Sequence, residues 1–281
     1  MNQFFGQIFT LLTTPPGNLI YHLVLAFSIA GALQGAIHHW HSNEFPQARR
    51  MILGLSVLLA LQLILFIISG LVWQGIFESQ IVLPPLDRAI TLLSLIWIAW
   101  LWAFPEPLRM ADAATLLLNL LAVALLGLTF VSWIQTGKTA TFNQTSLEVI
   151  WQIFALGIIL LGTAVTFARQ PNGWVNGLAL LGLAFLGHLI QLFSPQPEGN
   201  FPGLVRLAQL AMYPILLTLP QRFSLPAARP TIAKTDQKAP EQRRYSTDPK
   251  TFQALLKLAT EVNPNHLGYA ITHSIAQAML A

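Results

Sequence analysis

The sequence predicts an all-α membrane protein, a seven-transmembrane helix bundle with its N-terminus outside and its C-terminus inside. Of the 281 residues, 54% are hydrophobic and 9% are charged, whereas soluble domains carry about 25% charged residues. Seven apolar runs reach the length of about 20 residues that a transmembrane helix needs. Lysine and arginine also alternate between successive loops. The absence of cysteine excludes disulfides and thiolate metal sites.

Residues 1–17 are predicted to form an interfacial segment. Apolar side chains recur in a weakly amphipathic pattern, and Pro15-Pro16-Gly17 ends it. A basic n-region and a small-residue cleavage site are both missing, so we do not expect a cleaved signal peptide. We therefore expect a short helix lying on the outer leaflet.

Residues 18–219 contain the predicted seven-transmembrane domain, with spans joined by short loops rich in proline and glycine, such as Pro84-Pro85. Tryptophans stand near several span ends, as in an aromatic belt: Trp40, Trp73, Trp133 and Trp174. The predicted spans are Asn18–Trp40, Met51–Ile76, Leu86–Phe104, Ala114–Trp133, Val149–Ala168, Val175–Phe193 and Gly203–Leu219. The last is short and contains an arginine.

The orientation follows from the basic residues of the loops. Loops two and four contain only Arg88 and Lys138, and loop six has none. The other loops and the segment after the last span contain Arg49, Arg50, Arg109, Arg169, Arg222, Arg229, Lys234, Lys238, Arg243 and Arg244. Because basic residues favour the cytoplasmic side, this second set is predicted to be inside.

The C-terminal part differs in kind from the spans. Residues 220–247 are rich in proline and basic residues and lack apolar periodicity, which predicts a flexible basic linker. Residues 248–281 predict two amphipathic cytoplasmic helices, separated by the turn at Asn263-Pro264-Asn265. Two such helices cannot bury their apolar faces alone. We therefore interpret them as the start of an incomplete cytoplasmic domain.

The segments Phe252–Val262 and Ala270–Ala281 resemble the first helices of a GAF domain. With the seven short-looped spans before them, the chain is similar to the N-terminal seven-transmembrane sensor region of bacterial multidomain sensor histidine kinases. The resemblance implies a bacterial cytoplasmic (inner) membrane location, a homodimer formed through the cytoplasmic helices, and two-component signal transduction. His273 lacks the flanking residues of a phosphoacceptor box. Kinase activity would therefore require a further C-terminal transmitter.

Polar side chains within the spans gather toward the predicted outer side. The candidate ligand-binding residues are His22, Gln74, Gln152, His188, Gln191, Arg206, Gln209 and Tyr213. If their helix faces converge, they form a pocket that opens outward, with Arg206 as the fixed charge for a small anionic ligand. In the other interpretation, Arg206 reaches the outer interface and the glutamines are hydrogen-bond links between helices. Gly31 and Gly35 form a GxxxG pattern, which serves either dimerisation or internal packing.

The sequence argues against proton pumping, retinal binding, metal binding and catalysis. We expect no aspartate or glutamate inside the spans, which argues against a proton pump, and no span contains the lysine that retinal requires. The histidines His38, His39 and His41 are interpreted as interfacial rather than as metal ligands. We expect no catalytic residue, metal, cofactor or nucleic-acid partner. The lipid bilayer is the expected partner, and a small polytopic transporter or channel-like protein is the alternative function.

Overall fold

The computed structural model describes residues 2–14, 16–43, 46–136, 140–193 and 199–223. The predicted cytoplasmic helices, and all of the predicted linker beyond residue 223, lie outside the described residues. The helices are α1 (Asn2–Thr13), α2 (Gly17–Asn43), α3 (Pro46–Trp73), α4 (Ser79–Ala103), α5 (Arg109–Thr136), α6 (Ser146–Arg169), α7 (Trp174–Phe193) and α8 (Gly203–Met212). Three 3₁₀ turns are also present in this part of the chain, η1 (Phe142–Gln144), η2 (Tyr213–Thr218) and η3 (Pro220–Phe223).

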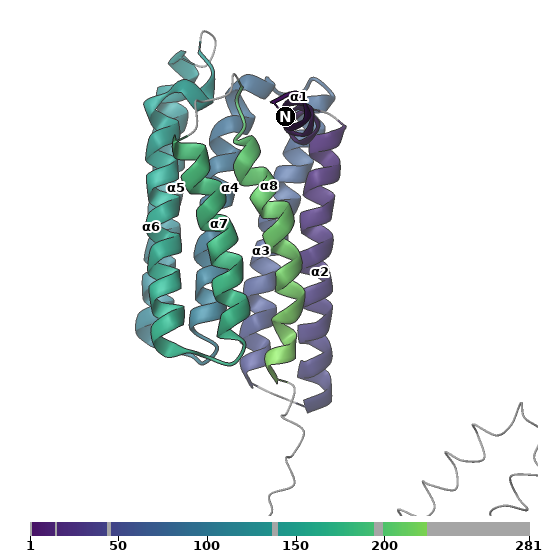
Figure 1. The fold of residues 1–281 in the computed structure, drawn as a ribbon, viewed down its shortest axis with the longest axis vertical. Helices are drawn as coiled ribbons and strands as arrows, with labels where there is room; N and C mark the ends of the chain where they lie inside the picture. The colour runs from purple at the N-terminus through teal and green to yellow at the C-terminus, as the bar shows by residue number, and fades with distance from the viewer. Residues whose placement is uncertain (1, 15, 44–45, 137–139, 194–198, 224–281) are drawn as a thin grey trace, which may run out of the picture. The chain divides into compact units, whose positions relative to one another are not determined.

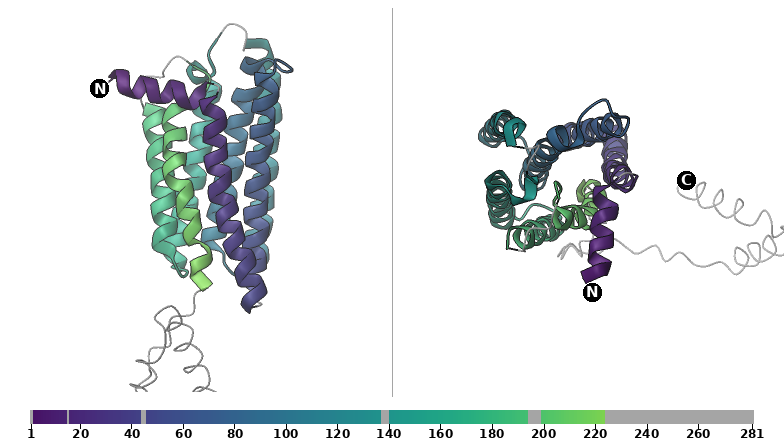
Figure 2. Two further views of the ribbon diagram at one scale, coloured as in Figure 1. Left: turned by 90° about the vertical axis from the view of Figure 1, so that its right-hand side faces the viewer. Right: turned by 90° about the horizontal axis from the view of Figure 1, so that it is seen from above.

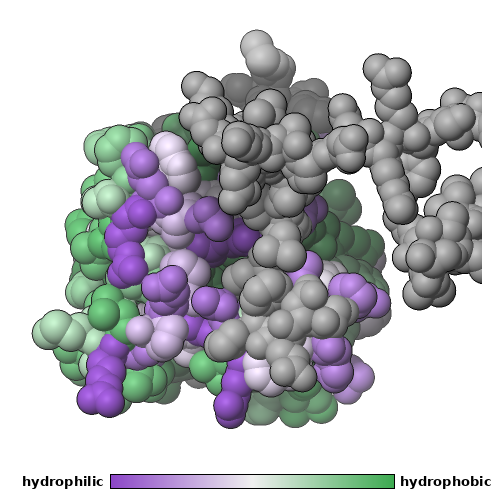
Figure 3. Space-filling model, turned by 90° about the horizontal axis from the view of Figure 1, so that it is seen from below, coloured by the Kyte–Doolittle hydropathy of each residue, from purple (hydrophilic) through white to green (hydrophobic). Residues whose placement is uncertain are grey.

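The seven-span prediction is confirmed. The described residues contain seven helices that are long and apolar enough to cross a membrane, the shortest of 20 residues. They stand side by side as an elongated bundle (Figure 1). Large apolar side chains such as Phe27 and Leu128 point outward, with 72% and 68% of their surface exposed. The protein is therefore a multi-pass membrane protein. Hydrophilic residues gather at the lower end of the bundle (Figure 3).

Helix α4 is the centre of the bundle and α5 lies at its edge. Within the apolar window of each span, 78% of α4 is buried, compared with 17% of α5. Helices α3, α5, α6 and α7 all pack against α4. Among the described elements, α4 is the one helix with which α5 makes extensive backbone contact. Helix α4 therefore has neighbouring helices on several sides.

Pro84 and Pro85 do not form the loop that the sequence predicts. They lie inside α4, which begins at Ser79 rather than at Leu86. A proline has no N–H, so Pro84 leaves the carbonyl of Gln80 without its helical donor. The indole of Trp133 supplies the missing donor, with Nε1 2.8 Å from the Gln80 oxygen. Trp133 is fully buried in this position, near the C-terminal end of α5, and the aromatic belt stays a prediction.

Helix α1 lies across the end of the bundle, approximately perpendicular to the spans (Figure 2). It is amphipathic, and its last turns contact α2 and α8. Gly17 permits the sharp corner into α2, because a Cβ there would lie 1.9 Å from the Leu11 carbonyl oxygen. The predicted N-terminal helix is confirmed, and its position at the membrane interface stays a prediction.

The last span is only partly α-helical. Helix α8 ends at Met212, and the chain continues as the 3₁₀ turns η2 and η3 to Phe223. Pro214 accounts for the change, since it cannot donate to the carbonyl four residues before it. The GxxxG pattern packs against this span. A Cβ on Gly31 would lie 2.7 Å from Leu217, and one on Gly35 would lie 2.9 Å from Pro220. The pattern thus serves packing within the chain.

Candidate functional site: a buried charge network

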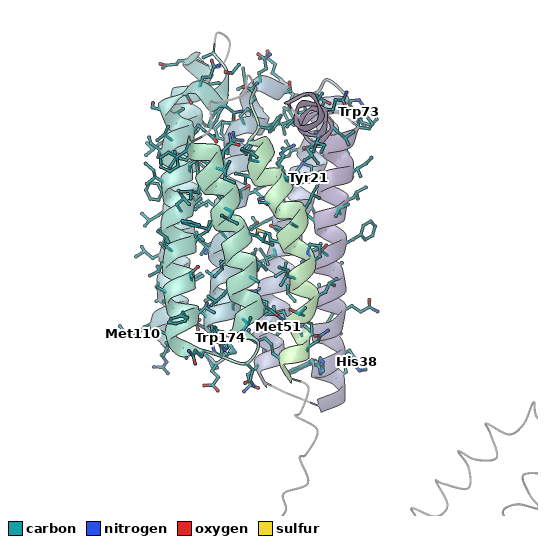
Figure 4. All side chains as sticks on the ribbon, viewed as in Figure 1. Tyr21, His38, Met51, Trp73, Met110 and Trp174 are labelled. Atoms are coloured by element: carbon teal, nitrogen blue, oxygen red, sulfur yellow. The ribbon has the colours of Figure 1, made fainter. Side chains whose placement is uncertain are left out.

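The bundle encloses most of the polar residues selected from the sequence. Those that are at least 96% buried are His22, Gln152, His188, Gln191, Arg206, Gln209 and Tyr213. Gln74 is exposed in the turn after α3 and does not belong with them. Tyr21, which neighbours His22, lies in the upper half of the bundle, toward the end that carries α1 and Trp73 (Figure 4).

Four charged side chains form the centre of this site. Arg88 Nε lies 2.6 Å from Glu148 Oε2, and Arg88 Nη1 lies 3.1 Å from Asp87 Oδ2. Arg206 Nη2 lies 2.7 Å from Asp87 Oδ1. These contacts join α4 to α6 and α8. We call Asp87, Arg88, Glu148 and Arg206 the charge network. Its formal charges cancel, as the low dielectric of a bundle interior requires.

The charge network contradicts the expectation that the spans lack acidic residues. Asp87 is 2% exposed and Glu148 is fully buried, and both lie within spanning helices. Asp87 looked like an edge residue because Pro84-Pro85 resembled a loop, and α4 begins before them. An adjacent acidic and basic pair, Asp87-Arg88, beside an apolar run was the available signal in the sequence. The charge network residues and their hydrogen-bond partners that the sequence analysis missed include Asp87, Arg88, Asn143 and Glu148.

Amide and imidazole groups extend the charge network into α7. Gln152 Nε2 donates to Glu148 Oε1 over 2.7 Å, and Gln152 Oε1 lies 2.6 Å from His188 Nδ1. Because the Gln152 oxygen can only accept, His188 Nδ1 must carry the proton of this hydrogen bond. On the other side, Arg88 Nη2 donates to Asn143 Oδ1 over 2.6 Å. The predicted residues Gln152 and His188 therefore hold the acidic partner of Arg88.

The structure contradicts one of the two roles considered for Arg206, and the other, binding of an anionic ligand, stays a prediction. Arg206 is 1% exposed, so it does not reach the interface, and its charge is already paired with Asp87. Its Nη1 donates to the carbonyl of Leu12 over 2.5 Å, at the C-terminal end of α1. A cation is favoured there by the helix dipole and by the unpaired last carbonyls. An anionic ligand that bound Arg206 Nη2 would have to displace Asp87.

A second set of hydrogen bonds continues from Arg206 along one face of the last span. Tyr21 donates to Gln209 Oε1, and Gln209 Nε2 donates to Thr91 over 3.2 Å. Further along, Gln62 Nε2 donates to the Tyr213 hydroxyl over 3.2 Å. The predicted common face of Arg206, Gln209 and Tyr213 is confirmed. It links α8 to α2, α3 and α4.

His22 has unused hydrogen-bonding capacity. It is fully buried, and neither ring nitrogen has a hydrogen-bond partner among the described residues. It lies within electrostatic range of Asp87 and Arg206. Arg206 Nε is likewise buried without a partner in the described part of the chain. A buried polar atom of this kind marks a place where a water or a ligand group would be stabilised.

Comparison with family models, with curated proteins and with solved structures finds no match to this chain. The function therefore has to be argued from the site. The charge network offers no nucleophile with an adjacent general base. Its buried ion pairs, whose charges sum to zero, join α4 to α6 and α8. Hydrogen bonds from Arg206 and from Gln152 add α1 and α7, so the site fixes the relative positions of five helices.

Proposed function

We propose that the chain is the membrane-embedded input module of a signalling protein, in which the last span transmits a change in bundle packing to residues 224–281. The observation that carries this proposal is the attachment of that span at both ends by buried arginines. Arg206 binds Asp87 near the start of α4. Arg222 donates to the carbonyls of Leu101 and Trp102 near its end, over 2.9 and 3.3 Å.

The two attachments make the position of the last span depend on α4. Arg222 also donates to the carbonyl of Asn172, in the connection between α6 and α7, over 2.7 Å. Between the two arginines the span changes from α-helix to 3₁₀ helix at Tyr213. Such a change within one span often marks a hinge. Loss of the upper attachment would allow the whole span, including η3, to shift relative to α4, and the chain continues directly from η3 into residues 224–281.

The finer assignment to a sensor histidine kinase rests on the resemblance of residues 252–281 to the start of a GAF domain. In that assignment the charge network lies near the outer surface of the membrane, and η3 lies near the inner surface. The output would come from a transmitter attached after those helices. The packing state of the upper half, set by a stimulus outside or within the membrane, would be the signal.

Distance measurements between spin labels test the proposed transmission. The chain contains no cysteine, so M110C and Q221C can be labelled specifically in the full chain in nanodiscs. Both sites are exposed. We expect D87N to shift or broaden the distance distribution, because it frees Arg206 from α4. The control R169Q removes an exposed charge outside the charge network and should leave the distribution unchanged. An unchanged distribution in D87N would contradict transmission through the last span.

Transport is the second candidate function, and the buried carboxylates favour it. Asp87 and Glu148 are the kind of membrane-embedded acidic groups found in proton relays. Proton flux into liposomes that contain the full chain, followed with an internal pH-sensitive dye, distinguishes the two functions. Flux that E148Q removes would favour transport over signalling. Pairing of both carboxylates with arginine favours the signalling function, since these ion pairs hold the charges in place.

A further inference from the structure

A groove runs along the outside of the bundle between α3 and α5, at the end opposite the charge network. Its volume is about 830 Å³, within the range of about 300–1,000 Å³ that is typical of ligand sites. Trp97 and Trp100 of α4 form the floor. Leu53 of α3 and Leu116 of α5 form the walls, and Arg49 lies at one end. The groove is independent of the residues used in the proposed function.

The groove exists because α3 and α5 both pack on α4 without extensive contact with each other. Indole groups secure α5 to the floor. Trp97 Nε1 donates to Asn119 over 3.0 Å, and Trp100 Nε1 donates to Asp112 over 2.8 Å. Leu53 and Leu116 are 56% and 65% exposed. In a bilayer this apolar, outward-facing space would be filled by lipid chains.

The charges at the end of the groove are not balanced. Arg50 is fully occupied: it forms a bidentate pair with Asp112, donates to the Phe104 carbonyl over 2.9 Å and stacks on Trp100 at 3.9 Å. Arg49 is exposed and makes no ion pair with any other described residue. Two guanidinium groups therefore face one carboxylate. One positive charge at this end of an apolar groove remains available for an anion.

We propose that this groove binds one anionic phospholipid, with its phosphate at Arg49 and an acyl chain along Trp97 between Leu53 and Leu116. A guanidinium group matches the geometry of a phosphate and binds it through paired hydrogen bonds. Basic pockets between transmembrane helices are known to hold the headgroups of anionic lipids. The bound chain fills the space between α3 and α5 and thereby joins the peripheral helix α5 to the rest of the bundle. Such binding stabilises the folded state by mass action.

Lipid binding to the purified full chain tests the proposal. Native mass spectrometry in a neutral detergent compares phosphatidylglycerol with phosphatidylcholine of identical acyl chains. We expect one tightly retained phosphatidylglycerol per protein. Removal of one interfacial charge, R49Q, should weaken its binding about fivefold. The matched control is R169Q, because Arg169 is an exposed arginine on α6, which does not line the groove.

A second variant separates the acyl-chain site from the charge. Ser56 lines the groove and is exposed, so S56F fills the space and leaves both arginines in place. We expect the S56F variant to lose the bound phosphatidylglycerol although Arg49 is still present. In a parallel measurement, brominated phosphatidylglycerol should quench tryptophan fluorescence less in W97F than in the wild type, because Trp97 lies on the floor.

Three outcomes would overturn the proposal. Equal retention of both lipids, unaffected by R49Q, would show non-selective lipid around the bundle only. Retention of phosphatidylglycerol that S56F does not change would place the lipid elsewhere. Complete competition by inorganic phosphate at millimolar concentration would show a site for the anion alone rather than for a lipid.

Discussion

At the scale of single residues, the structure depends most on Asp87. One carboxylate holds both Arg88 and Arg206, and so connects α4 to the last span. Burial of a charge in an apolar interior is costly unless it is paired, and loss of one partner leaves the others uncompensated. The exposed fraction of each ion pair therefore decides its contribution to stability. Asp87 is 3% exposed by its side chain, whereas Asp112 of the pair with Arg50 is 37% exposed.

We expect D87N to lower the free energy of unfolding by about 3–5 kcal/mol, the cost of breaking a buried ion pair. D112N should cost about 1 kcal/mol or less, because solvent screens a partly exposed pair. Thermal unfolding in the same detergent, followed by circular dichroism, compares the two variants. Equal losses would show that the burial of Asp87 does not determine its contribution.

At the scale of elements, individual backbone and side-chain contacts decide where helices begin and how closely they pack. Helix α4 continues through Pro84 because Trp133 of α5 takes over the donor role at Gln80. Helices α7 and α8 approach closely because Gly187 has no side chain. A Cβ at Gly187 would lie 2.4 Å from the Cβ of Ala208, whereas a Cβ at Gly182 on the same helix would meet nothing within 4 Å.

The Trp133 contact makes a prediction about rescue. W133F should cost about 0.5–1.5 kcal/mol, since it removes the hydrogen bond that the Trp133 indole donates to the Gln80 carbonyl. In the double variant P84A/W133F, the new N–H of residue 84 can donate to that carbonyl, so the loss should be smaller than in W133F alone. A double-mutant cycle of unfolding free energies measures the coupling. If the effects of P84A and W133F on the free energy of unfolding are strictly additive, the N–H of residue 84 does not replace the Trp133 indole as the donor to Gln80.

The glycine contact is tested by a matched pair of alanine variants. G187A should destabilise the protein by about 1–3 kcal/mol, because the added methyl group forces α7 away from α8. G182A should be neutral or stabilising by up to about 1 kcal/mol, because alanine is the better helix former and has free space there. Midpoints of thermal unfolding distinguish the two. A loss in G182A as large as that in G187A would show that helix packing is not the cause.

At the scale of the whole molecule, the predicted orientation decides which side meets a stimulus. The basic residues Arg49, Arg109 and Arg169 lie at the same end of the bundle as Trp174. The charge network lies toward the opposite end, with α1. If the positive-inside rule holds, the charge network is near the outer surface and η3 is near the inner one.

Cysteine labelling in intact cells checks this orientation. A membrane-impermeant maleimide should modify Q74C, which is exposed beyond the upper end of α3, and should leave E106C unmodified until the membrane is permeabilised. Both residues are exposed in short connections, so access to the reagent depends mainly on the side of the membrane. The reverse labelling pattern would invert the topology and place the charge network inside.

The sequence by itself determined the seven spans and the N-terminal helix, because the apolar length of a span and a helix-ending Pro15-Pro16-Gly17 are local properties. Of the eight polar residues selected from the sequence, all but Gln74 lie in the interior, but the selection missed the buried Asp87, Arg88 and Glu148. Only the tertiary structure decided how they pair. Asp87, Arg88 and Glu148 stand at apparent helix edges, and their burial depends on α6 and α8 packing against α4. Pairing between helices distant in the chain is set by packing, and no local pattern of residues encodes it.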